Sequence, residues 1–200
     1  MPYLGQWPMS TTAIRMTAEE YHAWSVEHDR TQLVGGEVIV NEPKPMHALL
    51  QARLIASIAA WIDAGETRGL AIGPTSLTLD EHNVYGPDVL WFSERKRPVD
   101  LHRYPEGVSD LCVEIRSPGT WRYDVGAKRG VYERTGLPEL WLVDDRSETV
   151  LVYRRSKPGL ETFDVSLELG RDETLSSPHM SGFALGLAKL FEVSAATRSG

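Results

Sequence analysis

The sequence has very little cysteine: Cys112 is the one cysteine among 200 residues. A single cysteine cannot form an intrachain disulfide, and it excludes a zinc site built from several cysteines. Cys112 lies in an apolar segment, where it is expected to be a small buried hydrophobic side chain. The cysteine content therefore gives no sign of an oxidising compartment.

Long apolar runs and several familiar motifs are also missing. No apolar run reaches the roughly 18 residues of a membrane-spanning helix, and residues 1–8 lack the basic start and apolar core of a secretory signal. The sequence has no G-x-x-x-x-G-K, G-x-G-x-x-G or G-x-S-x-G motif. We therefore expect a cytoplasmic protein without a membrane partner, outside the usual nucleotide-binding and serine-hydrolase classes.

Positive charge is scarce, since the chain has 21 Lys and Arg residues and 28 Asp and Glu residues, which gives a net charge of −7. This balance argues against broad attraction to nucleic acid, which usually appears as a basic domain. A local patch from Arg95 to Arg97, with Arg129 and Arg134, can coexist with it. The histidines other than His47, at positions 22, 28, 82, 102 and 179, show no paired metal-ligand spacing, so a zinc site is not expected.

What is present is typical of one globular domain, with 42% apolar and 24% charged residues. We predict a domain over residues 16–192, a loose arm over 1–15 and a polar tail over 193–200. Predicted helices cover about 17–28, 46–64, 121–135 and 185–191. Predicted strands cover 31–40 as a hairpin, 70–72 and 76–79 as an antiparallel meander, 84–92, 110–116, 139–144, 149–153 and, more weakly, 160–169. This order indicates an α/β or α+β fold around a mixed sheet.

The segment from Asp110 to Pro118 carries a carboxylate where a buried strand should be apolar. Because a strand alternates faces, Leu111, Val113 and Ile115 share one side, and Glu114 and Arg116 share the other. A carboxylate in such a place must be paired, bind a metal or take part in chemistry. Pairing with Arg116 at a sheet edge is the structural alternative.

A second carboxylate, Asp88, follows Pro87 at the head of a neighbouring strand. If the two strands pair antiparallel, Asp88 and Glu114 approach each other on one face, where their charges repel unless a cation joins them. Ligation by oxygen alone suits Mg²⁺ or Mn²⁺, with the backbone carbonyl of Ile115 as a further ligand.

Taken together in order and spacing, several motifs resemble the Uma-two family of restriction-endonuclease-like proteins. These motifs are Pro87-Asp88, Glu114-x-Arg116, Ser117-Pro-Gly-Thr120, Asp124-x-x-x-Lys128, the helix end Tyr132-Glu-Arg-x-Gly136, Glu139-Leu-Trp-Leu-Val-Asp144, the Leu33-to-Ile39 hairpin and the His47 helix. The resemblance covers roughly residues 16–155. It implies the PD-(D/E)-x-K nuclease superfamily, with a four-stranded mixed sheet flanked by helices and a divalent-metal site that hydrolyses phosphodiesters.

The resemblance also implies roles for individual residues. Asp88 and Glu114 would hold the metal, with Glu37 as a further ligand. The superfamily places a lysine two residues after the second acid, where this chain has Arg116, so Lys128 on the next helix takes the lysine's role. Arg116 and His47 are weaker candidates for phosphate contacts, since Arg116 stays protonated and cannot act as a base.

Each of these residues also has a structural interpretation. Asp124 and Lys128 are one helical turn apart and could form a surface ion pair, Asp88 could be a turn residue, and Glu37 could be an exposed strand start. The leading hypothesis is a nuclease that depends on Mg²⁺ or Mn²⁺ and acts on DNA. Its rival is a catalytically weak nuclease-fold binding module with protein partners, including a second copy of itself as a homodimer.

Overall fold

A central six-stranded sheet organises the computed structural model, which describes residues 15–25, 31–105 and 107–192. The strands run in the order β10 (Val165–Leu169), β9 (Thr149–Arg154), β8 (Glu139–Asp144), β7 (Leu111–Ile115), β6 (Val89–Phe92) and β3 (Leu70–Ile72). β7 and β8 pair in parallel, and the other neighbours in this sheet are antiparallel. The predicted mixed sheet is therefore confirmed, with six strands rather than the four that the resemblance implied.

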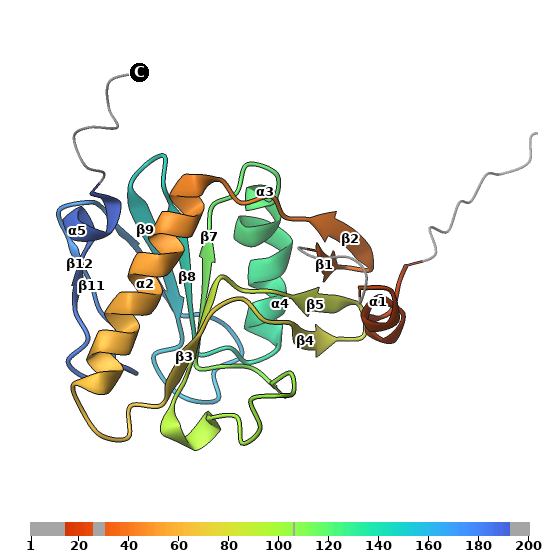
Figure 1. Ribbon diagram of the computed structural model, residues 1–200, viewed down its shortest axis with the longest axis horizontal. Helices are drawn as coiled ribbons and strands as arrows, with labels where there is room; N and C mark the ends of the chain where they lie inside the picture. Colours follow the sequence, from red (N-terminus) through yellow and green to blue (C-terminus); the bar gives the residue numbers. More distant parts are fainter. Residues whose placement is uncertain (1–14, 26–30, 106, 193–200) are drawn as a thin grey trace, which may run out of the picture.

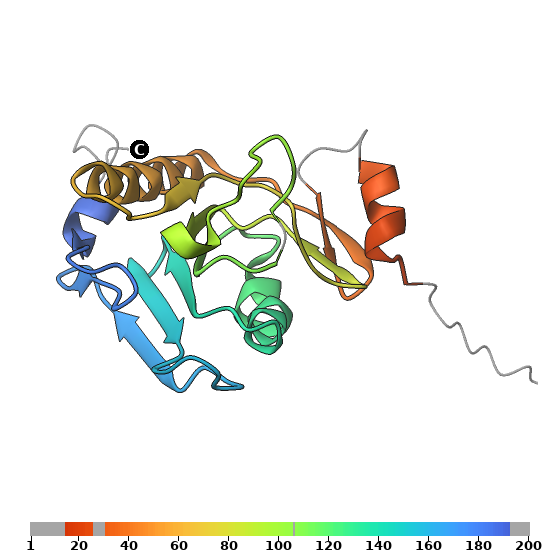
Figure 2. The same ribbon diagram turned by 90° about the horizontal axis from the view of Figure 1, so that it is seen from below.

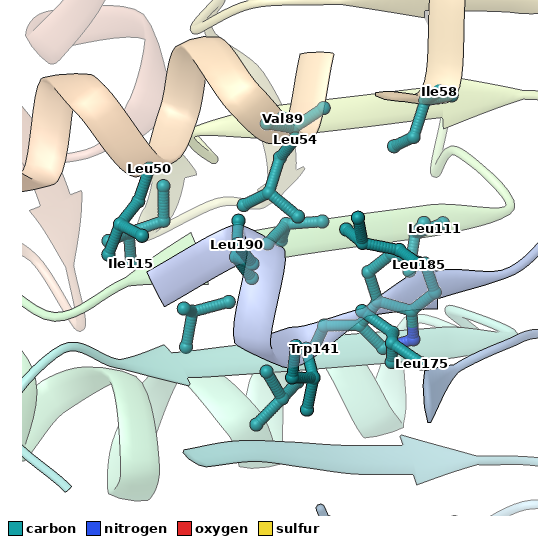
Figure 3. Packing of buried hydrophobic residues seen from close by; sticks show 14 of the residues in the cluster. Leu50, Leu54, Ile58, Val89, Leu111, Ile115, Trp141, Leu175, Leu185 and Leu190 are labelled. Atoms are coloured by element: carbon teal, nitrogen blue, oxygen red, sulfur yellow. The ribbon is translucent and has the colours of Figure 1, made fainter. Parts of the chain in front are cut away.

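Helices cover both faces of this sheet (Figures 1 and 2). One face packs against α2 (Pro45–Asp63) and α5 (Leu187–Phe191), and the other packs against the continuous helical segment α3 (Trp121–Tyr123), η2 (Asp124–Lys128) and α4 (Arg129–Arg134). In α2, Leu50, Leu54 and Ile58 repeat every four residues and are fully buried. Figure 3 shows Leu50 close to Ile115 and Leu54 close to Val89 of the sheet, with Leu190 of α5 nearby.

A smaller four-stranded sheet lies to one side of the central one (Figure 1), in the order β2 (Glu37–Val40), β1 (Thr31–Val34), β5 (Asn83–Tyr85) and β4 (Leu77–Asp80). β1 and β2 form the predicted hairpin, and its Gly35-Gly36 turn has φ angles of 59° and 82°, which glycine adopts without strain. α1 (Ala18–Ser25) packs Tyr21 against this sheet.

The start of α1 agrees with the predicted capping box. The Thr17 N–H donates to Glu20 Oε2 at 2.8 Å, and the Glu20 N–H donates to Thr17 Oγ1 at 3.2 Å. The predicted continuation to His28 lies outside the described residues, as do the tail over 193–200 and all of the N-terminal arm except Arg15.

The predicted antiparallel meander over residues 70–79 is wrong. β3 pairs with β6 in the central sheet, whereas β4 pairs with β5 in the smaller one. Likewise, the strand predicted over 84–92 is two strands in different sheets, β5 and β6, because Gly86-Pro87-Asp88 interrupts the ladder between them. The chain therefore crosses from the smaller sheet to the central sheet at Asp88.

The C-terminal part adds a short ladder of β11 (Thr174–Leu175) with β12 (Leu185–Gly186), and the loop after β6 contains the 3₁₀ turn η1 (Glu94–Lys96). Cys112 is fully buried, as predicted. Among the described helices, none combines the length and the apolar character needed to cross a membrane.

Candidate active site

Asp88 is fixed at the junction between the two sheets by the end of β7. The antiparallel register that pairs Val89 with Val113 places Asp88 next to Glu114. The Asp88 N–H donates to the Val113 carbonyl at 2.9 Å, and the Ile115 N–H donates to Asp88 Oδ2 at 2.6 Å. Asp88 is buried, so it is more than a turn residue at the surface. Ile115 joins the group through this backbone N–H.

Glu114 meets Lys128 in the interior, between β7 and the helical segment. Lys128 Nζ lies 2.7 Å from Glu114 Oε1 and 2.9 Å from Asp124 Oδ1. The Tyr132 hydroxyl donates to the same Glu114 oxygen at 2.6 Å. The side chains of Lys128 and Asp124 are each 2% exposed. The interpretation of Asp124 and Lys128 as a surface ion pair is therefore wrong, because both groups are buried against the sheet.

A π turn carries Asp124 and Lys128. The helix predicted over 121–135 is interrupted by η2, in which the hydrogen bonds span five residues instead of four. Asp124 and Lys128 both point from this turn toward the sheet, where the Lys128 ammonium lies 5.2 Å from the centre of the Tyr85 ring. The Thr120 hydroxyl donates to Asp124 Oδ2 at 3.3 Å. Single π turns inside α-helices are frequent at functional sites.

The charges of this group perturb each other. Burial raises the pKa of Glu114, the charge of Lys128 opposes this effect, and the negative charges of Asp124 and Asp88 add to it, so that the pKa lies at about 8. Burial acts to lower the pKa of Lys128, but the carboxylates of Glu114 and Asp124 outweigh it and raise that pKa above its ordinary value. Two carboxylates, Glu114 and Asp124, thus contact one ammonium, and a third, Asp88, is near enough for its charge to act on Glu114.

Arg116 has a different partner from the one suggested by the structural alternative. Its Nη1 lies 2.5 Å from Asp144 Oδ2, at the end of β8, and its guanidinium lies 5.4 Å from the centre of the Trp121 ring. Glu114 pairs with Lys128 instead, so the expected pairing of Glu114 with Arg116 at a sheet edge is wrong. The Arg116 side chain is 24% exposed and is accessible to a phosphate at the edge of the site.

His47 joins the group, and Glu37 does not. His47 lies in the first turn of α2, is buried, and has its Nε2 3.1 Å from Asp88 Oδ1. Glu37 is exposed at the start of β2 and lines a separate hollow with Arg15, Asp80 and Arg134. The Gly35-Gly36 turn points the start of β2 away from the junction of the sheets, which the resemblance alone could not reveal.

A cleft of about 440 Å³ opens beside Asp88. Its lining includes Asp88, His47, Gln51, Gln32, Asn41 and Tyr104. The Gln51 side-chain amide donates to the Asp88 carbonyl at 2.9 Å. Helical spacing indicates Tyr132, which is four residues after Lys128 and so shares its helix face. No motif indicates Gln32 or Asn41, which lie in and just after the hairpin.

The donor set can be tested against a divalent cation. Within residues 15–25, 31–105 and 107–192, no three His, Cys, Asp or Glu side chains form a cluster able to hold a metal. Mg²⁺, however, is usually held by one or two carboxylates, with waters and substrate oxygens completing the shell. Asp88 and Glu114 supply such a pair, since Asp88 is near enough for its negative charge to raise the pKa of Glu114, in addition to the larger effect of burial. The residues present therefore fit a hard divalent cation.

Comparisons with known proteins bear on the family and the fold of the chain. The model of the family Uma2, described as "Putative restriction endonuclease", matches residues 18–188. Among solved structures, the chain is similar to "a putative nuclease belonging to DUF820" from Anabaena variabilis, with a TM-score of 0.67 and 20% identity over 80% of this chain and 89% of that chain. At that identity the similarity establishes a shared fold. No curated protein matches the chain.

Proposed function

Because the chain belongs to the Uma2 family of restriction-endonuclease-like proteins, we propose that it is a divalent-metal-dependent nuclease that hydrolyses phosphodiester bonds of DNA. The observation that carries the proposal is the convergence of Asp88, Glu114 and Lys128 from the head of β6, from β7 and from η2 into one buried group. Family membership and the shared fold support the nuclease class. The metal, the substrate and the roles below are our proposal.

Asp88 and Glu114, with the backbone carbonyl of Ile115, would hold Mg²⁺ or Mn²⁺. Such an ion, when bound, supplies a water of lowered pKa and neutralises charge on the leaving oxygen. The protein holds the two carboxylates ready for it, since the Ile115 N–H fixes Asp88 and the Tyr132 hydroxyl fixes Glu114. Hydrogen bonds donated to metal-binding carboxylates orient these carboxylates and tune their affinity for the metal.

Lys128 would act as a cation beside the scissile phosphate. Its raised pKa keeps it protonated at neutral pH, so it can orient water and stabilise negative charge on the phosphate but cannot accept a proton. Asp124 positions Lys128 from within the same π turn. Arg116 and His47 are placed at the margin of the group and would contact neighbouring phosphate oxygens.

One observation favours the binding module as a second candidate. The Lys128 side chain is 2% exposed and is already paired with two carboxylates, Glu114 and Asp124. A lysine in that state can be a structural cation that replaces a metal. The net charge of −7 also suits protein partners, including a second copy of the chain, better than nucleic acid.

Cleavage of supercoiled plasmid and of short oligonucleotides with Mg²⁺ or Mn²⁺ separates the two candidates. The variants are Asp88→Asn and Glu114→Gln, with Glu139→Gln as the matched buried-glutamate control, since Glu139 lies on β8 and is also buried. A nuclease cuts in wild type and in Glu139→Gln, stops cutting in EDTA, and is lost in the other two variants. Absence of cutting, or cutting that survives in all variants, would establish the binding module as the better interpretation.

A further inference from the structure

The cleft beside Asp88 is polar but carries no positive side chain. Its lining is made of amide, hydroxyl, histidine, tyrosine, proline and glycine residues, together with the single carboxylate of Asp88. A phosphate-binding pocket would be expected to contain Lys or Arg, or a helix N-terminus with free N–H groups. α2 does start near the cleft, but Pro45 at its first position has no N–H. The cleft therefore suits an uncharged polar group.

Several buried polar atoms of the cleft residues have no partner. Gln32 Oε1, Asn41 Oδ1 and His47 Nδ1 form no hydrogen bond, although Gln32 is only 6% exposed and His47 only 4%. Buried polar groups are nearly always hydrogen-bonded in native proteins, and each exception needs an explanation. All three side chains line the same cleft. These residues therefore bring unused hydrogen-bonding capacity to the cleft.

An exposed aromatic side chain stands at the rim. Tyr104 lines the cleft, is 64% exposed, and stacks on His22 with 6.0 Å between ring centres. His22 is held in turn by a 2.9 Å contact between its Nε2 and the Thr78 hydroxyl. An exposed, supported aromatic ring is the kind of surface on which an unpaired base stacks.

We infer that this cleft binds an unpaired nucleobase, read by the amides of Gln32 and Asn41 and bordered by Tyr104. A base presents several donors and acceptors on an uncharged ring, which matches neutral amides with unused hydrogen-bonding capacity. In an intact duplex the pairing edge is hidden, so a base reaches the cleft from a single strand or after flipping out of the helix. The inference rests on the proposed function, because the base would lie beside Asp88 and hence beside the scissile phosphate.

Binding without cleavage tests this inference. Fluorescence anisotropy in EDTA compares labelled single-stranded DNA of about 12 nucleotides, the same strand with abasic sites, single-stranded RNA and a duplex. Wild type is expected to bind the base-bearing DNA strand at least about tenfold more tightly than the abasic strand and the duplex. Equally tight binding of the RNA strand would assign the cleft to unpaired bases of either nucleic acid.

Variants locate the effect in the cleft. Gln32→Leu and Asn41→Leu keep approximate side-chain size and remove the amides, so each should weaken binding of the base-bearing strand several-fold and leave the abasic strand unaffected. Tyr104→Ala should do the same, whereas Val99→Ala is the control, because Val99 lies in the same loop, is fully exposed and does not line the cleft. Thermal unfolding verifies that every variant is folded.

The inference is overturned if wild type binds base-bearing and abasic strands equally, prefers the duplex or binds none of the probes, or if folded cleft variants bind as wild type does. These results are independent of the cleavage assay. A protein that cuts DNA but ignores the bases keeps the proposed function and loses this inference. A protein that binds the bases but never cuts keeps the cleft site and loses the nuclease.

Discussion

Two buried glutamates lie on neighbouring strands of the central sheet, and their surroundings differ. Glu139 on β8 accepts hydrogen bonds from two neutral donors, the Trp141 indole N–H and the Ser177 hydroxyl, both at 2.6 Å. Glu114 on β7 faces the Lys128 ammonium, with the carboxylates of Asp124 and Asp88 close enough to raise its pKa. Glu139 is thus hydrogen-bonded by neutral donors, with His179 4.0 Å away, whereas Glu114 lies in a cluster of charges.

Burial raises the pKa of both glutamates, so a perturbed pKa alone does not separate them. Glu139 and Glu114 differ in the groups that contact each carboxylate. Both oxygens of Glu139 have neutral donors, and the group is complete as a structural link between β8 and the segment carrying Ser177. Glu114 is held in an excess of negative charge, an arrangement that an added cation would relieve. This difference is the reason for our proposal of a chemical role for Glu114 and a structural role for Glu139.

The largest expected effect concerns the cation of the charged cluster. Lys128→Met leaves Glu114 and Asp124 buried without their ammonium, and we expect the free energy of unfolding to fall by about 3–5 kcal/mol. The control is Lys96→Met, because Lys96 forms a 3.1 Å pair with Asp110 but is 29% exposed, and there the loss should be about 1 kcal/mol or less. Urea denaturation measures both. Similar losses in the two variants would contradict the view that the Lys128 cluster is electrostatically distinct.

The next effect is on catalysis and compares the glutamates directly. Glu114→Gln should lower the initial rate of metal-dependent DNA cleavage at least about 100-fold. The substitution removes the negative charge of the proposed metal ligand but keeps the shape of the side chain. Glu139→Gln should leave the rate within about twofold of wild type, since Glu139 contacts only neutral donors and the partly exposed His179. Equal losses in both variants would show that Glu114 acts through folding rather than through chemistry.

The sequence predicted those parts of the fold that depend on local pattern. The Gly35-Gly36 hairpin, the α2 helix and the individual strands β7 and β8 follow from turn chemistry and periodicity, and all are present. The meander was wrong because strand pairing is decided by tertiary packing: β3 and β4 have similar patterns but join different sheets.

The site, like the fold, was predictable from the sequence only in part. The antiparallel pairing on which the predicted approach of Asp88 to Glu114 depended is present in the register of β6 and β7. The burial of Lys128 was not foreseeable, because acid-lysine pairs four residues apart on a helix are usually exposed and the π turn has no sequence signature. Nor could the sequence reveal the unpartnered Gln32, whose meaning depends on a cleft formed by distant segments.

A smaller effect is the pH dependence of stability in the metal-free protein. The pKa of Glu114 rises from 4.5 to about 8 on folding, so the folded state binds this proton more tightly than the unfolded state. Its contribution is complete below about pH 4.5 and is lost as the pH rises through about 8, at no more than about 1.4 kcal/mol per pH unit. Urea denaturation in EDTA at several pH values should show a steeper decline in wild type than in Glu114→Gln. Identical slopes would mean that Glu114 is ionised in the folded protein throughout this range.

The smallest effect concerns Tyr132, whose hydroxyl donates to Glu114. Tyr132→Phe should lower the free energy of unfolding by about 1 kcal/mol, because Glu114 keeps Lys128 as a partner after the hydroxyl is lost. A double-mutant cycle tests whether this energy comes from the contact between Tyr132 and Glu114. Tyr132→Phe combined with Glu114→Gln should depart from additivity by at least about 0.5 kcal/mol, whereas Tyr132→Phe combined with Glu139→Gln should be additive within that margin. Coupling of Tyr132 to both glutamates would show that the two carboxylates share one network, and the distinction between a chemical and a structural glutamate would then fail.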